Sequence, residues 1–376
     1  MDAIARAPRI AGKDIHQDTL KPGDMLLRGQ YRIEEYLGAG GFGITYRARD
    51  CLDRGVVIKE CYPKAICTRD DKQVATRSRK MQPEFEAIVR DFGLEARRMS
   101  RLVHPNIAGV HQVFEENGTV YMAMDLVPGR DLLDIIEKDR DRFTPADVKE
   151  MLTKLLGAIA YLHDRDILHR DISPDNILVD EDANPVLIDF GAAHEMAARS
   201  SARVSELHTV KDGYSPQEFY LSKAEQDASS DLYSLAATFY HLVTGSAPAD
   251  SQTRLSEIAQ NKPDPLGTVH TVMEGYDHYF TEALERGLEV FPKDRLRSAR
   301  DWITMIDEEK RRKSLAWQAR NDEEIDRVIR ELTAETNLAI AETLGAGRGG
   351  ERTADDSSAR GKRKMPGGRA CVTIEP

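Results

Sequence analysis

The fold of this chain is decided by the stretch His169-Arg170-Asp171-Ile172-Ser173-Pro174-Asp175-Asn176 and, shortly after it, Asp189-Phe190-Gly191. The order and spacing of these residues match H-R-D-x-x-x-x-N followed by D-F-G. Each short motif occurs by chance in unrelated chains. The two motifs in this order and at this spacing are far more specific.

Upstream of this stretch lies a glycine cluster, Gly38-Ala39-Gly40-Gly41-Phe42-Gly43. It fits G-x-G-x-x-G, a pattern that dinucleotide folds and ordinary turns also produce. A dinucleotide fingerprint runs from a strand into a helix, whereas here strand-like residues lie on both sides of the glycines. Glycine lets backbone N–H groups approach phosphate oxygens closely. The pattern therefore predicts a phosphate-binding loop between two strands.

A lysine follows the next strand, in Val56-Val57-Ile58-Lys59, and Glu95 lies on the helix expected after it. Taken singly, each reads as an ordinary surface charge. Their joint placement behind the glycine cluster favours another reading, in which Lys59 reaches the phosphates of a nucleotide and Glu95 holds it in place.

The hydrophobic pattern predicts a small β-rich lobe followed by a larger helical lobe, an α+β organisation. The expected elements of the first lobe are strands at Tyr31–Leu37, Ile44–Arg49 and Val56–Ile58, a helix at Pro83–Leu102, and a hairpin of Val110–Phe114 with Val120–Leu126. The expected helices of the second lobe are Thr144–Asp164, Ser230–Thr244, Asp277–Glu289 and Ala299–Glu309.

With these motifs in place, the chain resembles the eukaryotic-like protein kinase superfamily from about Tyr31 to Ile306. The stretches 42–46, 59–63 and 212–216 look most like its bacterial serine/threonine branch. The resemblance implies a bilobal kinase domain at 31–306, with an N-lobe at 31–127 and a C-lobe at 128–306. It also implies ATP- and Mg²⁺-dependent transfer of the γ-phosphate to serine or threonine hydroxyls of protein substrates, with autophosphorylation, in a signalling role.

The same resemblance assigns roles to individual residues. Asp171 would orient the substrate hydroxyl, Lys59 and Glu95 would form an ion pair, and Asn176 and Asp189 would hold two Mg²⁺ ions. The residues expected to contact ATP are Gly38, Ala39, Gly40, Gly41, Phe42, Gly43, Thr45, Val57, Lys59, Met124, Asp125, Val127, Asp131 and Leu178. Thr45 stands where relatives more often carry valine.

Three further positions resemble residues that hold the kinase fold together. Glu218 resembles the glutamate that closes the activation segment, and Arg295 is its expected ion-pair partner. Asp231 resembles the buried aspartate that supports the catalytic loop. These residues are expected to be structural and not catalytic.

One position departs from the family pattern. Ser173 stands where serine/threonine kinases normally carry a lysine that contacts the γ-phosphate, and Lys211 stands where they usually carry a threonine that pairs with that lysine. The pair looks swapped. We therefore expect Lys211 to place its ammonium in the space beside Ser173 and to act as a catalytic residue. An exposed, idle lysine is the alternative.

The replacement of the usual lysine by Ser173 leaves two other functions open. A pseudokinase scaffold would bind nucleotide without efficient phosphotransfer. A small-molecule phosphotransferase of related fold is disfavoured, because such enzymes lack the complete activation segment from Asp189 to Glu218. Within that segment, Ser200, Ser201, Ser205 and Thr209 are candidate phosphorylation sites that would neutralise Arg170.

Composition and charge restrict the partners and the cellular location that the sequence predicts. A net charge of −11 over 376 residues, with no dominant basic block before the tail, argues against nucleic acid as the main partner. No apolar run is long enough for a membrane span, and the N-terminus carries charges where a signal peptide needs an apolar core. Cys51, Cys61, Cys67 and Cys371 lack metal spacing and are expected to be reduced thiols. We therefore expect a cytoplasmic protein.

The regions around the kinase domain are less informative. Residues 1–30 form an N-terminal extension. The insert between Glu60 and Glu95 is basic and expected to be solvated; the alternatives are that it binds an acidic partner or flanks the helix that positions Glu95. Residues 307–344 have the pattern of a charged amphipathic helix, which serves either as a spacer or as a surface for the kinase, a partner or a second copy. Residues 345–376 lack the apolar side chains to fold alone and are expected to be a disordered tail.

Overall fold

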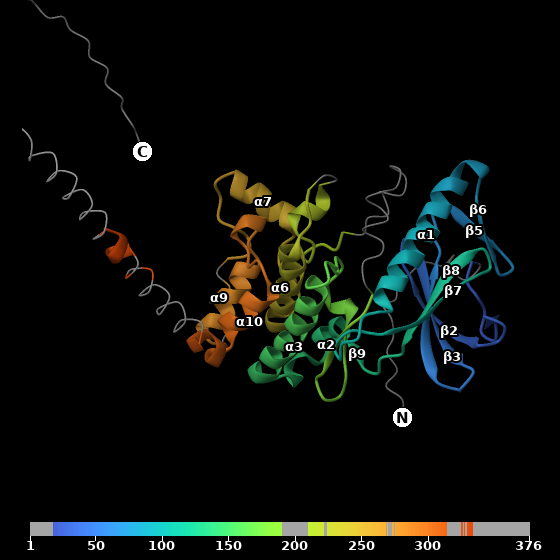
Figure 1. Ribbon diagram of the computed structural model, residues 1–376, viewed down its shortest axis with the longest axis horizontal. Coiled ribbons are helices and arrows are strands. Elements are labelled where there is room, and N and C mark those ends of the chain that lie inside the picture. The colour runs from blue at the N-terminus through green and yellow to red at the C-terminus, as the bar shows by residue number, and fades with distance from the viewer. Residues whose placement is uncertain are drawn as a thin grey trace, which may run out of the picture. The chain divides into compact units, whose positions relative to one another are not determined.

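The computed structural model describes residues 18–189, 210–221, 224–267, 269, 273, 275–313, 325, 327 and 329–333. The chain divides into two compact units, Met1–Arg312 and Lys313–Pro376. The first unit holds an antiparallel sheet and a set of helices as two lobes (Figure 1). This is the bilobal α+β arrangement that the hydrophobic pattern predicts.

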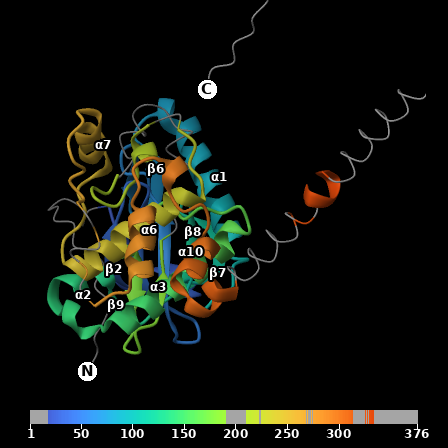
Figure 2. The ribbon, with the colours of Figure 1, turned by 90° about the vertical axis from the view of Figure 1, so that its left-hand side faces the viewer.

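The N-lobe is built on an antiparallel sheet of six strands in the order β1-β2-β3-β4-β8-β7. The strands are β1 Met25–Leu26, β2 Tyr31–Ala39, β3 Gly43–Asp50, β4 Gly55–Cys61, β7 Val110–Glu116 and β8 Thr119–Asp125. The three strands and the hairpin that the sequence predicts are all present, and their ends differ from the predicted ones by at most three residues. Helix α1, Gln82–Met99, packs on the sheet beside β7 and β8 (Figure 2).

Pairing within the sheet sorts the side chains of β4 onto two faces. Lys59 is opposite Thr45 on β3 and Met122 on β8, so these three side chains share one face. The neighbouring residue Glu60 points to the other face, opposite Tyr121. The face that carries Lys59 is therefore separated from the face that carries Glu60 by the thickness of the sheet.

The insert between Glu60 and Glu95 is not the solvated segment that its charge predicts. It contains a second small sheet, the hairpin of β5 Cys67–Asp70 and β6 Gln73–Thr76, and a short 3₁₀ turn, η2 Arg79–Met81, that leads into α1. The guanidinium of Arg69 is buried and forms an ion pair with the fully buried carboxylate of Glu60. Because a buried charge needs a partner, this pair ties the hairpin to β4.

The same carboxylate organises the rest of that face. Glu60 accepts hydrogen bonds from the hydroxyls of Tyr46 and Tyr121, at 3.0 and 2.6 Å. Arg69 also donates to the backbone carbonyl of Asp18, and the backbone N–H of Leu20 donates to the Tyr46 hydroxyl. The segment that precedes β1 and the inserted hairpin thus cover the face of the sheet opposite Lys59.

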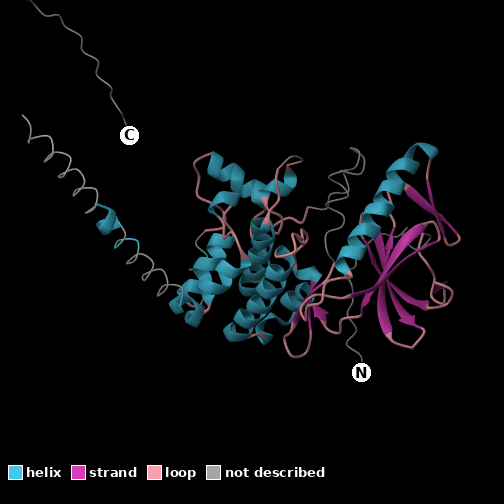
Figure 3. Cartoon of the chain, in the orientation of Figure 1, coloured by secondary structure: helices cyan, strands magenta, loops and turns pink. Residues whose placement is uncertain are grey.

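The C-lobe consists mainly of helices (Figure 3). Its helices are α2 Leu132–Asp139, α3 Pro145–His163, α6 Ala228–Thr244, α7 Ser251–Ala259, α9 His278–Gly287 and α10 Ala299–Ile306. A three-stranded sheet of β9 Arg130–Asp131, β10 Ile177–Val179 and β11 Pro185–Leu187 lies at its edge. Short 3₁₀ turns occur at η3 Arg140–Arg142, η4 Pro174–Asn176, η5 Gln217–Tyr220 and η6 Pro292–Asp294.

Local sequence explains where the main helices start and stop. Thr144 and Asp147 form a reciprocal capping box at the start of α3, with Pro145 at the first helical position. Asp227 and Ser230 do the same for α6, which ends at Gly245 in the left-handed conformation. The four helices that the sequence predicts in this lobe are confirmed, whereas α2 and α7 were not predicted.

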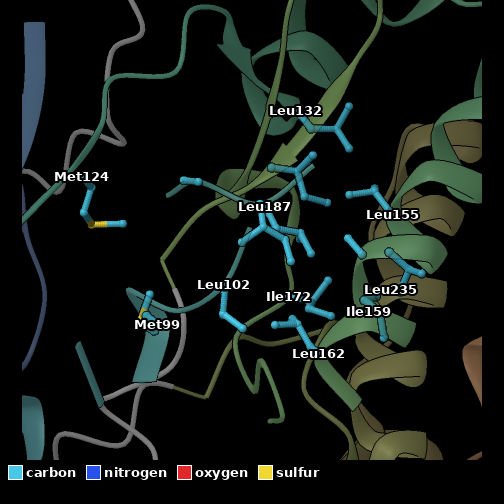
Figure 4. Close-up of a cluster of buried hydrophobic side chains, with 14 of the residues drawn as sticks. Met99, Leu102, Met124, Leu132, Leu155, Ile159, Leu162, Ile172, Leu187 and Leu235 are labelled. Carbon is cyan, nitrogen blue, oxygen red and sulfur yellow. The ribbon is translucent and has the colours of Figure 1, made fainter. Parts of the chain in front are cut away.

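A continuous buried core links the two lobes. Figure 4 draws part of it, with Met99 and Met124 on the N-lobe side and Leu155, Ile159 and Leu235 on α3 and α6. Each of these side chains is at most 5% exposed. Among the described residues, no helix combines the length and apolar character that crossing a membrane requires. Of the helix expected at 307–344, residues 307–313, 325, 327 and 329–333 are described, and all of these except Asp307 are helical.

Candidate active site

The glycine cluster forms the turn between β2 and β3, with strands on both sides as expected. The backbone N–H of Gly40 donates to the carbonyl of Gly43 at 2.9 Å, and the buried Phe42 accepts from the N–H of Tyr62 at 2.7 Å. A β-carbon on Gly43 would lie 2.8 Å from the carbonyl oxygen of Glu60. The close approach of β3 to β4 therefore requires glycine at this position.

The residues expected around the adenine base lie on strands of both lobes. Val57 and Met124 are cross-strand partners on β4 and β8. Asp125 ends β8, where its carboxylate accepts from the Gly109 N–H at 2.7 Å. Leu178 pairs with Asp131 across β10 and β9. Their contacts with ATP stay predictions.

Asp131, the expected ribose contact, also begins α2. Its carboxylate accepts from the backbone N–H of Asp134 at 2.7 Å, which makes it the N-cap of the helix. Burial raises the pKa of this carboxyl, and the nearby Asp134 carboxylate adds to the rise. One oxygen of Asp131 is thus committed to the helix.

The buried carboxylate of Asp231 holds the backbone of the catalytic loop in place. This carboxylate accepts from the backbone N–H groups of His169 and Arg170, at 2.9 and 2.8 Å, and contacts Nε2 of His163 at 2.8 Å. Burial alone would raise the pKa of Asp231, but these hydrogen bonds and the histidines outweigh it and hold the pKa below its usual value. The structural role expected of Asp231 is confirmed.

Asp171 and Asn176 lie in direct contact. Nδ2 of Asn176 donates both to the backbone carbonyl and to Oδ2 of Asp171, each at 2.7 Å. Burial raises the pKa of Asp171 to about 6, although the positive charge of Lys211 acts in the opposite direction. Asp171, which the motif assigns to the substrate, and Asn176, which it assigns to the metal, are thus in direct contact.

Lys59 forms an ion pair with the carboxylate of Asp189. Asp189 lies in the left-handed backbone region, with φ of 57°. Burial alone would raise its pKa, but the charge of Lys59 outweighs it and holds the pKa below the usual value. Glu95 lies on α1 and is half-buried. Its pairing with Lys59 stays a prediction. Phe190 and Gly191, like the four candidate phosphorylation sites, lie outside the described residues.

Lys211 and Ser173 are in contact, as the swapped pattern predicts. Nζ of Lys211 donates to Oγ of Ser173 at 2.7 Å and forms ion pairs with Asp171 at 3.1 Å and Asp175 at 3.0 Å. Ser173 itself is fully buried. Burial alone would lower the pKa of Lys211, but the carboxylates of Asp171 and Asp175 outweigh it and hold the pKa above its usual value. The ammonium therefore remains charged beside Asp171.

The backbone around Lys211 is fixed by its own segment. Its N–H donates to Oγ of Ser215 at 3.0 Å, and its carbonyl accepts from the Ser215 N–H at 2.9 Å. The carbonyl of Ser215 in turn accepts from the buried hydroxyl of Ser251 at 2.9 Å. These bonds anchor the start of the described segment 210–221 to α7.

The end of that segment is fixed by the expected ion pair. The guanidinium of Arg295 binds both oxygens of Glu218, at 2.6 and 3.0 Å, and both residues are buried. Arg295 also donates to the carbonyls of Glu289 and Val290, each at 2.7 Å. The prediction that Glu218 and Arg295 pair is confirmed.

The donor set suits a hard divalent cation. Asp189 offers carboxylate oxygens and Asn176 an amide oxygen, which are ligands that Mg²⁺ accepts. The side chain of Asp189 is 40% exposed and forms an ion pair with the ammonium of Lys59. These residues therefore fit the Mg²⁺ that the motif implies.

Comparison with known proteins agrees with this geometry. Residues 31–302 match the protein kinase domain family. The chain belongs to this family. The resemblance inferred from the sequence motifs is thereby confirmed, as is the bilobal kinase fold.

Three curated relatives of the kinase carry the name serine/threonine-protein kinase. PknF of Mycobacterium tuberculosis H37Rv is 30% identical over 287 residues, which is 73% of this chain and 55% of PknF. PknH of Mycobacterium bovis is 27% identical over 73% of this chain and 43% of PknH. PknA of Nostoc sp. is 28% identical over 75% of this chain and 48% of PknA. The kinase thus spans about half the length of these relatives.

A solved structure, the PpkA-294 apo form, also resembles the kinase. It is 31% identical in sequence, with a TM-score of 0.66, and the match covers 77% of this chain and all of that one. The shared region is again the bilobal domain.

Sequence reasoning missed one residue at this site. Asp175 contacts both Ser173 and Lys211, through Oδ1 at 2.6 Å and Oδ2 at 3.0 Å. The signal was present, because an acidic residue stands two positions after the serine that replaces the usual lysine. A displaced cation needs a carboxylate near its new position.

Proposed function

We propose that this kinase transfers the γ-phosphate of ATP to serine or threonine hydroxyls of protein substrates, and to its own chain. The observation that carries the proposal is the contact of Asp171 with both Asn176 and Lys211, together with the ion pair of Lys59 with Asp189. Family membership and the names of the curated relatives support the same reaction. When bound, ATP would supply the phosphoryl group and Mg²⁺ would neutralise charge on its oxygens.

The side chains of the kinase would divide the remaining work. Asp171, with its raised pKa, would accept a hydrogen bond from the substrate hydroxyl and hold that oxygen in line for attack. Asn176 would keep Asp171 oriented and, with Asp189, would hold the metal. Lys59 would bind the phosphates from the sheet side. Positioning and charge then provide most of the catalysis.

Lys211 would provide the positive charge that the family normally places at position 173. Its ammonium lies beside Asp171 and remains protonated, so it can stabilise negative charge that develops on the transferring group. This role separates an active kinase from the pseudokinase alternative, in which the cation would be missing. The retention of Lys59, Asn176 and Asp189 supports activity.

Transfer of labelled γ-phosphate to a generic protein acceptor tests the proposal. We expect transfer by the wild type and its loss in Asp171→Asn and Asp189→Asn. The matched control is Asp141→Asn, because the Asp141 side chain is 98% exposed. Nucleotide binding without any transfer by the wild type would favour the pseudokinase. Turnover stimulated by a small metabolite but by no protein would favour a small-molecule phosphotransferase.

The cellular location and the domain boundaries of the kinase are part of the proposal. We place it in the cytoplasm, in signalling, because ATP is available there and because the described cysteines, Cys51, Cys61 and Cys67, are free thiols. We propose the domain boundaries given above, with residues 307–344 as a helix for a partner or a second copy. Chemical crosslinking of the full chain, compared with a chain that ends at residue 312, tests the last point.

A further inference from the structure

Asp175 bridges two parts of the chain that come together at the active site. Its Oδ1 accepts from the hydroxyl of Ser173 at 2.6 Å, and its Oδ2 accepts from the ammonium of Lys211 at 3.0 Å. Ser173 and Asp175 belong to the catalytic loop, whereas Lys211 belongs to the segment that leads to Glu218. One carboxylate therefore joins the catalytic loop to the activation segment.

The ammonium of Lys211 has a complete set of acceptors. A lysine ammonium has three N–H donors, and this one has three oxygen partners: Asp171 at 3.1 Å, Asp175 at 3.0 Å and Ser173 at 2.7 Å. Three partners restrict both the position and the orientation of the ammonium. A lysine held by one carboxylate alone would keep much of its rotational freedom.

The three partners have different tasks during the proposed reaction. Asp171 must turn toward the substrate hydroxyl, and Ser173 carries no charge. Asp175 is the remaining carboxylate of this set, and its side chain is only 21% exposed. It can therefore retain the ammonium while Asp171 is engaged.

We propose that Asp175 is a positioning residue that holds the Lys211 ammonium at the reacting group and so makes catalysis depend on the placement of the activation segment. This inference rests on the proposed function, in which Lys211 is the relocated cation. A lysine at position 173 would belong to the catalytic loop itself. Here the charge belongs to Lys211 of the activation segment, and the bond from Lys211 to Asp175 holds that segment against the catalytic loop.

A double-mutant cycle tests whether Asp175 acts through Lys211. The variants are Asp175→Asn, Lys211→Ala and the two combined, with Asp175→Glu as a conservative variant. The control is Glu150→Gln, which removes a carboxylate from an exposed ion pair with Lys154 on α3. Turnover and the KM for ATP are measured for each, and thermal unfolding checks that each is folded.

We expect Asp175→Asn to lower kcat about tenfold or more, with little change in the KM for ATP, and Asp175→Glu to retain part of the rate. In the Lys211→Ala background the same Asn substitution should cost less than about twofold. An equal loss in both backgrounds would mean a merely structural role and would overturn the inference. If Asp175→Asn does not fold, the cycle is run with Asp175→Glu, for which the loss should again vanish without Lys211.

A second readout needs no nucleotide. In the nucleotide-free protein, the acylation rate of the Lys211 amine is followed by mass spectrometry with a lysine-reactive ester. Asp175→Asn should raise this rate several-fold, while Glu150→Gln should leave it unchanged. An unchanged rate in Asp175→Asn would contradict the docking role of Asp175.

The outcomes separate this inference from the proposed function. If Lys211→Ala turns over as fast as the wild type, the proposed role of Lys211 fails. If Lys211→Ala loses turnover and Asp175→Asn keeps it, only the inference about Asp175 fails. The acylation experiment tests the docking even in a protein that transfers no phosphate.

Discussion

Nζ of Lys211 donates a hydrogen bond to Oγ of Ser173 at 2.7 Å, across 38 positions of sequence. The serine stands where the family carries a lysine, and the lysine stands where the family carries a threonine. A positive charge thus lies beside the catalytic loop although the residue that usually provides it is absent. Because electrostatic catalysis depends on where a charge lies, we propose that Lys211 takes the role of the missing lysine.

The buried pair of Glu60 and Arg69 should carry much of the stability of the N-lobe. Arg69→Met leaves the Glu60 carboxylate buried without its cation, and breaking such a pair costs about 3 to 5 kcal/mol of unfolding free energy. Urea unfolding measures the loss. Glu60→Gln together with Arg69→Met should recover part of it, because glutamine still offers an acceptor to Tyr46 and Tyr121.

The control for this prediction is Arg79→Met, a change at an exposed arginine in η2. Surface changes of this kind usually alter the free energy of unfolding by less than about 0.5 kcal/mol. If Arg69→Met is no more costly than Arg79→Met, the inserted hairpin does not depend on the buried pair.

The buried Glu218–Arg295 pair should contribute far more to stability than an exposed pair of arginine with a carboxylate. Arg295→Lys cannot keep the two-oxygen contact with Glu218 and the bonds to the two carbonyls, so we expect a loss of about 3 kcal/mol in unfolding free energy. Arg300→Ala, which breaks the exposed pair with Asp164, should cost less than about 1 kcal/mol. Comparable losses in the two variants would contradict the structural role of Arg295.

Acid should weaken the fold through the buried His169. Burial lowers its pKa to about 4, from an ordinary value of 6.5. Between those values the unfolded chain binds more protons than the folded one, so the stabilisation is full above pH 6.5 and is lost as the pH falls toward 4. The contribution of this residue between pH 7 and 5 is on the order of 2 kcal/mol.

Comparison with His169→Gln isolates this effect. His104 and His241, whose pKa values are also lowered by burial, are common to both proteins and cancel in the difference. Urea unfolding at pH 7 and pH 5 should show a smaller fall in the variant than in the wild type. Equal falls would show that His169 does not titrate as its burial predicts.

Hydrophobic periodicity and helix-capping residues were sufficient to predict the longer helices and strands. The first residues of the strand Tyr31–Ala39 alternate between buried and exposed, and α3 begins at a Thr-Pro signal, so each could be predicted from neighbouring residues alone. The helix α2 was missed because eight residues give only two turns of pattern. Short elements depend on their neighbours for burial, and those neighbours are distant in the sequence.

The insert and Asp175 could not be predicted for a related reason. Arg69 reads as a surface charge unless the position of Glu60 in space is known, and their contact depends on the inserted hairpin packing against β4. Asp175 lies in the 3₁₀ turn η4, whose three residues are too few to show periodicity, and a carboxylate in such a segment is ordinarily solvated. By contrast, the contact of Lys211 with Ser173 was predictable because the family pattern fixes where both positions meet.

Phosphotransfer by variants that remove or move the Lys211 charge tests most directly whether this lysine supplies the catalytic charge. Lys211→Ala should lower kcat for phosphotransfer about 100-fold or more, whereas Lys262→Ala, at a lysine in an exposed pair with Glu257, should leave it unchanged. Ser173→Lys with Lys211→Thr restores the usual family arrangement and should recover most of the lost rate. Wild-type turnover in Lys211→Ala would contradict the claim that this lysine supplies the catalytic charge.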